Sequence, residues 1–168
     1  AGWGEFGPFH DHTLEHSSRW LSAAIEAAYE GFPASLRNDV EVNAIVPALP
    51  LAEIDQWVRT ALDEFGTRVF KVKCGDADFR NDFERIDEIR YVLDHSQVND
   101  WSIRLDVNGQ WSVDQAIERI KVLNEAASGR IEYVEQPVQS LADCATVRAA
   151  SARRWKCRAV RDVARRCG

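Results

Sequence analysis

The chain alternates short apolar runs with longer segments of helical period, and this alternation restricts its fold more than any other feature. Apolar runs typical of buried strands begin near residues 43, 69, 102 and 131, so they recur about every 30 residues. This interval is the size of one strand-plus-helix unit. Four such units in a row predict an α/β fold with a parallel sheet.

Hydrophobic periodicity and helix-ending residues set the expected boundaries. The strands are expected over 42–47, 68–73, 102–107 and 131–135, and the helices that follow them over 51–65, 79–93, 113–123 and about 141–150. Gly66 is predicted to end the first of these helices, and Ser112 begins the third with a capping-box pattern. An earlier helix is expected from Leu14 to Ala28.

Both a doubly wound sheet and a closed barrel have this alternation. A doubly wound nucleotide-binding sheet should carry a glycine-rich turn after its first strand. Here that turn is Pro47-Ala48-Leu49-Pro50, and neither GxGxxG nor GxxxxGK[ST] occurs in the chain. Nucleotide binding by those motifs is therefore not expected. Charged residues at the strand ends favour the barrel, because its open rim can accommodate them.

Composition limits the classes of partner. The 168 residues are 45% apolar, which fits one ordinary domain or part of a larger one. No apolar stretch is long enough to predict a membrane span. Four cysteines without a CxxC pair indicate a reduced, cytoplasmic protein. The net charge of −6 does not favour binding to nucleic acid.

Residues 151–168 differ in charge from the rest of the chain. They hold seven basic residues and one acidic residue, a net charge of +6, which leaves −12 on the preceding 150 residues. One interpretation is a natural basic tail. The other is a slipped reading frame between about Leu141 and Trp155. Read one base earlier, the codons of Trp155-Lys156-Cys157-Arg158 encode Val, Leu or Met, then Glu, then Val or Met, then commonly Pro or Ser, which would start a fifth strand.

Polar side chains gather on one face of three successive predicted strands. Strand alternation places together Lys71 and Lys73 of the second strand, Arg104, Asp106 and Asn108 of the third, and Tyr133 and Glu135 of the fourth. Each of them, taken singly, is most often a solvated strand residue or a helix cap. Three consecutive strands that end in charge on the same face justify the hypothesis of a site.

The residue types at this rim indicate a particular chemistry. Asp106 and Glu135 supply the carboxylate oxygens that a hard cation such as Mg²⁺ prefers, and the absence of histidine argues against zinc. A metal there would stabilise an enolate-like dianion, and a neighbouring lysine could move a proton. The expected substrate is therefore a small molecule that bears a carboxylate.

Lys71-Val72-Lys73, Leu105-Asp106-Val107-Asn108-Gly109 and Tyr133-Val134-Glu135-Gln136-Pro137 resemble three motifs of the enolase superfamily. The opening Gly2-Trp3-Gly4-Glu5-Phe6-Gly7 and the run Asn43-Ala44-Ile45-Val46-Pro47-Ala48 resemble more specifically the bacterial o-succinylbenzoate synthase family. The resemblance covers residues 1–150. It implies part of an α+β capping domain in residues 1–41, the first half of a (β/α) barrel in 42–150, and a basic tail in 151–168 whose frame we question.

The resemblance also implies an activity and roles for the rim residues. The family uses Mg²⁺ to form o-succinylbenzoate by dehydration in menaquinone biosynthesis. Lys73 would be the acid/base lysine with Lys71 as electrostatic support, and Asp106 and Glu135 would be the first two metal ligands. Asn108 would lie beside the metal site and bind substrate.

Two further groups of the family pattern are not identified in this chain. They are a third carboxylate after a fifth strand and an opposing lysine after a sixth. We therefore expect a fragment with little or no activity of its own. A related N-succinylamino acid racemase or epimerase, which uses the same residues, is one alternative. A non-catalytic protein whose basic tail contacts an acidic partner is another, and the sequence predicts no oligomeric state.

Overall fold

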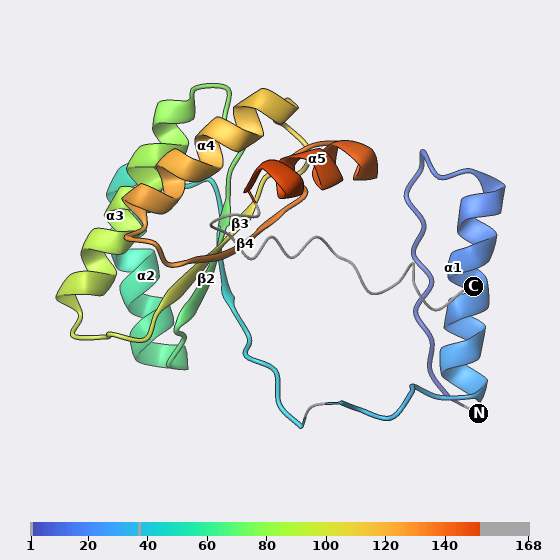
Figure 1. Ribbon diagram of the computed structural model, residues 1–168. Coiled ribbons are helices and arrows are strands. Elements are labelled where there is room, and N and C mark those ends of the chain that lie inside the picture. The colour runs from blue at the N-terminus through green and yellow to red at the C-terminus, as the bar shows by residue number, and fades with distance from the viewer. Residues whose placement is uncertain (1, 37, 152–168) are drawn as a thin grey trace. The chain divides into compact units, whose positions relative to one another are not determined.

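The computed structural model describes residues 2–36 and 38–151, which are coloured in Figure 1. The chain divides into two compact units, one ending at Val40 and the other beginning at Glu41, and each is described by itself. In the described ranges, no helix is both long and apolar enough to cross a membrane. The predicted basic tail lies outside the described residues except for Ser151, as does the strand start proposed near Trp155.

The first unit is built on one helix, α1 (Leu14–Tyr29), which confirms the helix predicted there. It begins at Thr13, whose side-chain oxygen accepts a hydrogen bond from the His16 N–H at 3.2 Å. The extended segment at Gly2 and Gly4 lies directly against α1, because a Cβ at either glycine would overlap a helix carbonyl oxygen. No residue of α1 is buried, and neither is any other described residue of this unit, so its described part has no enclosed core.

The described part of the second unit, up to Ser151, contains one sheet of four strands. They are β1 (Ala44–Val46), β2 (Val69–Lys73), β3 (Ser102–Asp106) and β4 (Ile131–Glu135). All neighbouring pairs are parallel, and the strands lie in the order β1-β2-β3-β4. Chain order and spatial order therefore coincide, as in a barrel; a doubly wound sheet reverses its strand order at a switch point.

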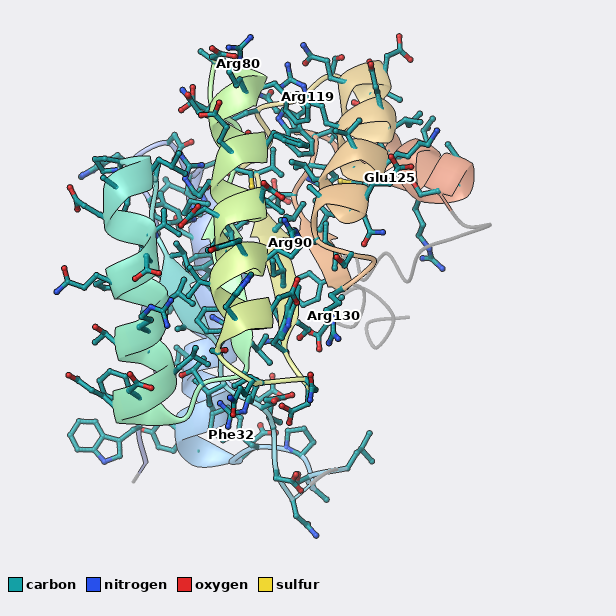
Figure 2. The ribbon with its side chains drawn as sticks, turned by 90° about the vertical axis from the view of Figure 1, so that its left-hand side faces the viewer. Phe32, Arg80, Arg90, Arg119, Glu125 and Arg130 are labelled. Carbon is teal, nitrogen blue, oxygen red and sulfur yellow. The ribbon has the colours of Figure 1, made fainter. Side chains whose placement is uncertain are left out.

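A helix follows each strand. The helices are α2 (Leu51–Phe65), α3 (Phe79–His95), α4 (Val113–Ala126) and α5 (Leu141–Ser151). Successive helices pack against one another, and α2, α3 and α4 lie on the same side of the sheet in Figure 1 and next to each other in Figure 2. Helices on one face and strands in chain order confirm the predicted α/β fold of barrel type.

The core lies between the sheet and its helices. Phe70 and Val72 of β2 and Leu105 of β3 point toward the helices and are fully buried. Ile86 and Ile89 of α3 meet them at helical spacing and are also fully buried. Most apolar side chains of the strands thus face the helices, and the alternate positions near the carboxyl ends are left for the polar rim.

Local signals set most boundaries correctly. Gly66 ends α2 in the left-handed conformation with φ of +63°, and Ser112 and Gln115 form the predicted capping box. The prediction for β1 was too long, because only residues 44–46 pair with β2. Both predicted helices are confirmed, and α3 and α4 continue past their last apolar positions to His95 and Ala126.

Candidate active site at the carboxyl ends of the strands

Strand pairing brings the predicted rim residues into one row. Lys73 of β2 is opposite Asp106 of β3, and Asp106 is opposite Glu135 of β4. One position earlier on the same face, Lys71 is opposite Arg104. Residues that lie about 30 positions apart in sequence are therefore neighbours at the carboxyl end of the sheet.

Asp106 is the centre of a network that joins all five predicted site residues. Lys73 Nζ donates to Asp106 Oδ2 at 2.6 Å and to Asn108 Oδ1 at 3.0 Å. Lys71 Nζ lies 3.1 Å from Asp106 Oδ2 and 2.9 Å from Glu135 Oε2. The Asp106 side chain is only 3% exposed, whereas that of Lys73 is 38% exposed. The Lys73 side chain is therefore more accessible to solvent than the Asp106 side chain that it binds.

The charges of this network reinforce one another. Burial alone would lower the pKa of Lys71, but its hydrogen bonds with Glu135 and Asp106 raise that pKa above the ordinary value. Burial alone would raise the pKa of Asp106, but hydrogen bonds from Lys73 and Lys71 bring it below the ordinary value. At neutral pH, Asp106 is therefore a carboxylate and Lys71 an ammonium.

One carboxylate oxygen at the centre of the site has no partner in the described part of the chain. Asp106 Oδ1 is buried and accepts no hydrogen bond among the described residues, although Oδ2 of the same group meets two lysines. An orphaned carboxylate oxygen beside Glu135 fits a hard divalent cation. Within residues 2–36 and 38–151, no cluster of three or more His, Cys, Asp or Glu could hold a metal. Asp106 and Glu135 are a candidate pair of donors because they lie opposite each other on β3 and β4.

A second polar layer lies beneath this row. Arg104 Nε donates to Glu132 Oε2 at 2.7 Å, and Arg104 Nη1 donates to Asn43 Oδ1 at 2.9 Å. The guanidinium group also lies over the Tyr133 ring, 5.4 Å from its centroid. Arg104 therefore links the amino-terminal side of β1 to β4 below the site.

Sequence alternation missed the contribution of Glu132. Ile103 pairs with Ile131 but Arg104 pairs with Tyr133, so Glu132 is an extra residue at a register shift. A bulge of this kind turns a side chain out of strict alternation. Its sequence signal is weak, because the irregularity comes from the pairing of two strands.

The loops after β3 and β4 are joined by backbone hydrogen bonds. The Gly109 N–H donates to the Gln136 carbonyl at 2.7 Å, and the Trp111 N–H donates to the Pro137 carbonyl at 3.2 Å. Asn108 adopts a left-handed conformation with φ of +54°, just beyond the end of β3. This turn, rather than strand alternation, carries the Asn108 side chain to Lys73.

Sequence reasoning also missed two charged residues of α3 that lie close to Lys73. Asp82 and Arg85 are buried, and Arg85 Nη1 donates to the Lys73 carbonyl at 3.1 Å. A signal for them exists in the sequence: they are three residues apart and share the apolar stripe of α3 with Ile86 and Ile89. Ionisable residues on a buried helix face are rarely without a specific partner.

The strand order and the charged rim together define a domain of the (β/α)-barrel class. Residues 53–158, more than half of the chain, match the family described as enolase C-terminal domain-like, and residues 1–28 match the enolase N-terminal domain-like family. The chain therefore belongs to the enolase superfamily, as its three motifs predicted.

Known relatives give the comparison more detail. An o-succinylbenzoate synthase from Mycolicibacterium smegmatis is 38% identical over 152 residues, which are 89% of this chain and 43% of that protein. The chain thus spans about two fifths of the length of this relative.

Solved structures also show similarity to this chain. The substrate-liganded L-Ala-D/L-Glu epimerase from Bacillus subtilis is similar with a TM-score of 0.57 and 31% identity, over 66% of this chain and 30% of that one. An enolase from Bradyrhizobium complexed with magnesium and mandelic acid also has a TM-score of 0.57, with 27% identity over 66% of this chain and 29% of that one.

Proposed function

We propose that this chain carries the acid/base lysine and two metal ligands of a Mg²⁺-dependent lyase of the o-succinylbenzoate synthase type. The reaction would remove a proton beside a carboxylate and eliminate water, and it would serve menaquinone biosynthesis in the cytoplasm. The observation that carries the proposal is the row of Lys73, Asp106 and Glu135 on three neighbouring strands. The 38% identity to an o-succinylbenzoate synthase supports the choice of reaction.

Asp106 and Glu135 are the residues that would hold the metal. Both are carboxylates, and the buried Asp106 Oδ1 has no partner among the described residues. A bound Mg²⁺ would supply positive charge to the carboxylate of the substrate as negative charge develops there. Two protein carboxylates are compatible with this ion, since Mg²⁺ usually keeps several water ligands.

Lys73 is the proposed acid/base residue. Its Nζ is bound to Asp106 and Asn108, and no other bond to it is made by the described residues. The third position on the nitrogen is therefore the one that would take a proton from the substrate as the neutral amine, or return it as the ammonium. Its side chain is also more exposed than that of Lys71, 38% against 20%. Lys71, held between two carboxylates, would act as electrostatic support, and Asn108 would bind substrate beside Lys73.

We propose that the 168-residue chain by itself has little or no turnover. In our interpretation, residues 1–41 belong to a capping domain and residues 42–150 form the first half of a barrel. The resemblance implies a third carboxylate and an opposing lysine elsewhere in the complete site. Without them a substrate would not be held between two groups, and positioning contributes many kcal/mol to catalysis.

A chimera can test the proposed reaction directly. Residues 1–150 would replace the matching part of the Mycolicibacterium smegmatis relative, which then supplies the rest of the barrel. We expect Mg²⁺-dependent formation of o-succinylbenzoate by the chimera and its loss on Lys73→Ala, with Lys121→Ala as the matched surface control. A folded chimera with no turnover would contradict the proposal. Turnover by the isolated chain close to that of the relative would contradict the fragment interpretation.

The second candidate function is a racemase or epimerase of N-succinylamino acids. The similarity to the Bacillus subtilis epimerase favours it, because proton removal beside a carboxylate needs the same lysine and metal ligands. Exchange of the α-proton for deuterium on an N-succinylamino acid, without loss of water from the dehydratase substrate, would select this function.

A non-catalytic role would instead predict salt-sensitive partner binding that is lost when residues 151–168 are removed.

We also propose that residues near 151–168 are translated out of frame. Their net charge of +6 against −12 for the rest supports this, as does the strand start encoded one base earlier. Sequencing of the coding DNA from codon 140 onward tests it. A one-base shift that restores a Val-x-Val-Pro run, a carboxylate and a further lysine is the expected result. An intact frame would refute it.

A further inference from the structure

A buried ion pair on α3 binds the backbone of Lys73 from behind the sheet. Asp82 is 0% exposed and Arg85 is 5% exposed, and Arg85 Nη1 lies 3.1 Å from Asp82 Oδ1. The same nitrogen donates to the carbonyl oxygen of Lys73 at 3.1 Å. Burial of such a pair adds little stability beyond what apolar residues would provide, so its directed hydrogen bonds are its main consequence.

Asp82 holds the turn that follows Lys73. Its Oδ2 accepts hydrogen bonds from the Gly75 N–H at 2.8 Å and from the Asp76 N–H at 3.2 Å. Gly75 has φ of +102°, and a Cβ there would lie 2.9 Å from the Gln110 side chain. The turn is therefore enclosed between α3 and the loop after β3.

Strand pairing leaves the Lys73 carbonyl without a strand partner among the described residues. The ladder between β1 and β2 ends at the pair Val46 and Val72. On the other side, β3 continues beside Lys73, and the Cys74 N–H donates to the Asp106 carbonyl at 2.9 Å. Successive residues of a strand present their backbone groups to opposite sides. Since Cys74 bonds toward β3, the Lys73 carbonyl points to the β1 side, where Arg85 meets it.

We propose that Arg85, oriented by Asp82, is a positioning residue that binds the Lys73 carbonyl in place of a strand partner. It fixes the end of β2 so that the Lys73 ammonium group meets Asp106 and Asn108. Lys71 does not need this support, because its backbone lies inside the ladder between Ile45 and Arg104. Whether this positioning matters for catalysis rests on the proposed acid/base role of Lys73. The positioning of the Lys73 ammonium group does not depend on that role.

The two lysines provide a test with an internal reference. An ammonium group bound to carboxylates exchanges its protons more slowly than a free one, so it can be followed in the ¹⁵N spectrum of the lysine-labelled full chain. In the double variant Asp82→Asn/Arg85→Met, we expect the Lys73 ammonium signal to be lost and the Lys71 signal to remain. Lys73→Arg and Lys71→Arg assign the two signals. Both charges are removed together because a single substitution would leave one buried charge unpaired.

Asp87 and Arg90 form the matched control pair. They have the same three-residue spacing on α3, with Arg90 Nη2 2.6 Å from Asp87 Oδ1, and Arg90 lies on the outer side of the helix in Figure 2. Asp87→Asn/Arg90→Met is expected to leave both ammonium signals unchanged. The proposal is overturned if Lys73 keeps its signal without the Asp82–Arg85 pair, or if both lysines lose theirs together.

The unaltered chain offers a second measurement that does not depend on folding of a variant. If Asp82 holds the turn, the Gly75 and Asp76 amides should exchange with solvent as slowly as those of β2 and β3, although they lie outside the strands. Exchange at the rate of an open loop would overturn the proposal. Neither measurement uses a substrate, so failure of the positioning and failure of the proposed reaction are distinguishable.

Discussion

Lys71 occupies the position from which a cation would bind both carboxylates, so its removal should strengthen Mg²⁺ binding. Its Nζ lies 3.1 Å from Asp106 Oδ2 and 2.9 Å from Glu135 Oε2. A metal ion that binds these groups must weaken both contacts. A hydrogen bond between charged groups contributes about 1.5–3 kcal/mol, and solvent at Lys71 and Glu135 places this site at the lower end of that range.

A gain of about 1.5 kcal/mol corresponds to about tenfold in a dissociation constant. We therefore expect Lys71→Met to bind Mg²⁺ about tenfold more tightly than the unaltered chain in isothermal titration calorimetry at neutral pH and low salt. Lys121→Met, an exposed lysine of α4, is the matched control and should leave the affinity unchanged. Asp106→Asn should abolish binding, because it removes the central carboxylate.

Equal or weaker binding by Lys71→Met would refute this reasoning. Lys71 would then organise the two carboxylates for the metal instead of competing with it. High salt distinguishes the two cases further, since screening should reduce the difference between the variant and the unaltered chain only if the competition is electrostatic.

Three other perturbations have defined outcomes. Because the folded pKa of Asp106 is lowered, its carboxylate stabilises the fold above the unfolded pKa of about 3.9, and that contribution is lost as pH falls through the folded pKa. The unfolding free energy of Asp106→Asn should therefore depend less on pH below about pH 5 than that of the unaltered chain, as urea titrations at several pH values can test. Ile103→Ala, in the closed core, should cost about 2–5 kcal/mol in urea unfolding, whereas Ile45→Ala, at a half-exposed position on β1, should cost much less. Ser112→Ala removes one half of the capping box and should cost about 1 kcal/mol; an unchanged unfolding midpoint would show that this cap does not limit stability.

Local patterns in the sequence determined the elements and the face on which the rim residues within the strands lie. The apolar runs at Phe70 and Leu105 alternate with Lys71 and Asp106, and a period of two allows only one side to enter the core. The helix caps at Gly66 and Ser112 depend on residues within the same turn, so they could be read directly from the sequence. These features require no knowledge of which strands pair.

Only the tertiary structure decided how the site is connected. The pairing of Lys73 with Asp106, the bridge that Lys71 makes between two carboxylates and the register shift that turns Glu132 toward Arg104 all join residues from different strands. Likewise, Arg85 of α3 meets the Lys73 carbonyl just beyond the end of the ladder between β1 and β2. The charge pattern of the rim comes from local alternation in the sequence, whereas these contacts depend on strand lengths and helix packing, which no short segment of the chain encodes alone.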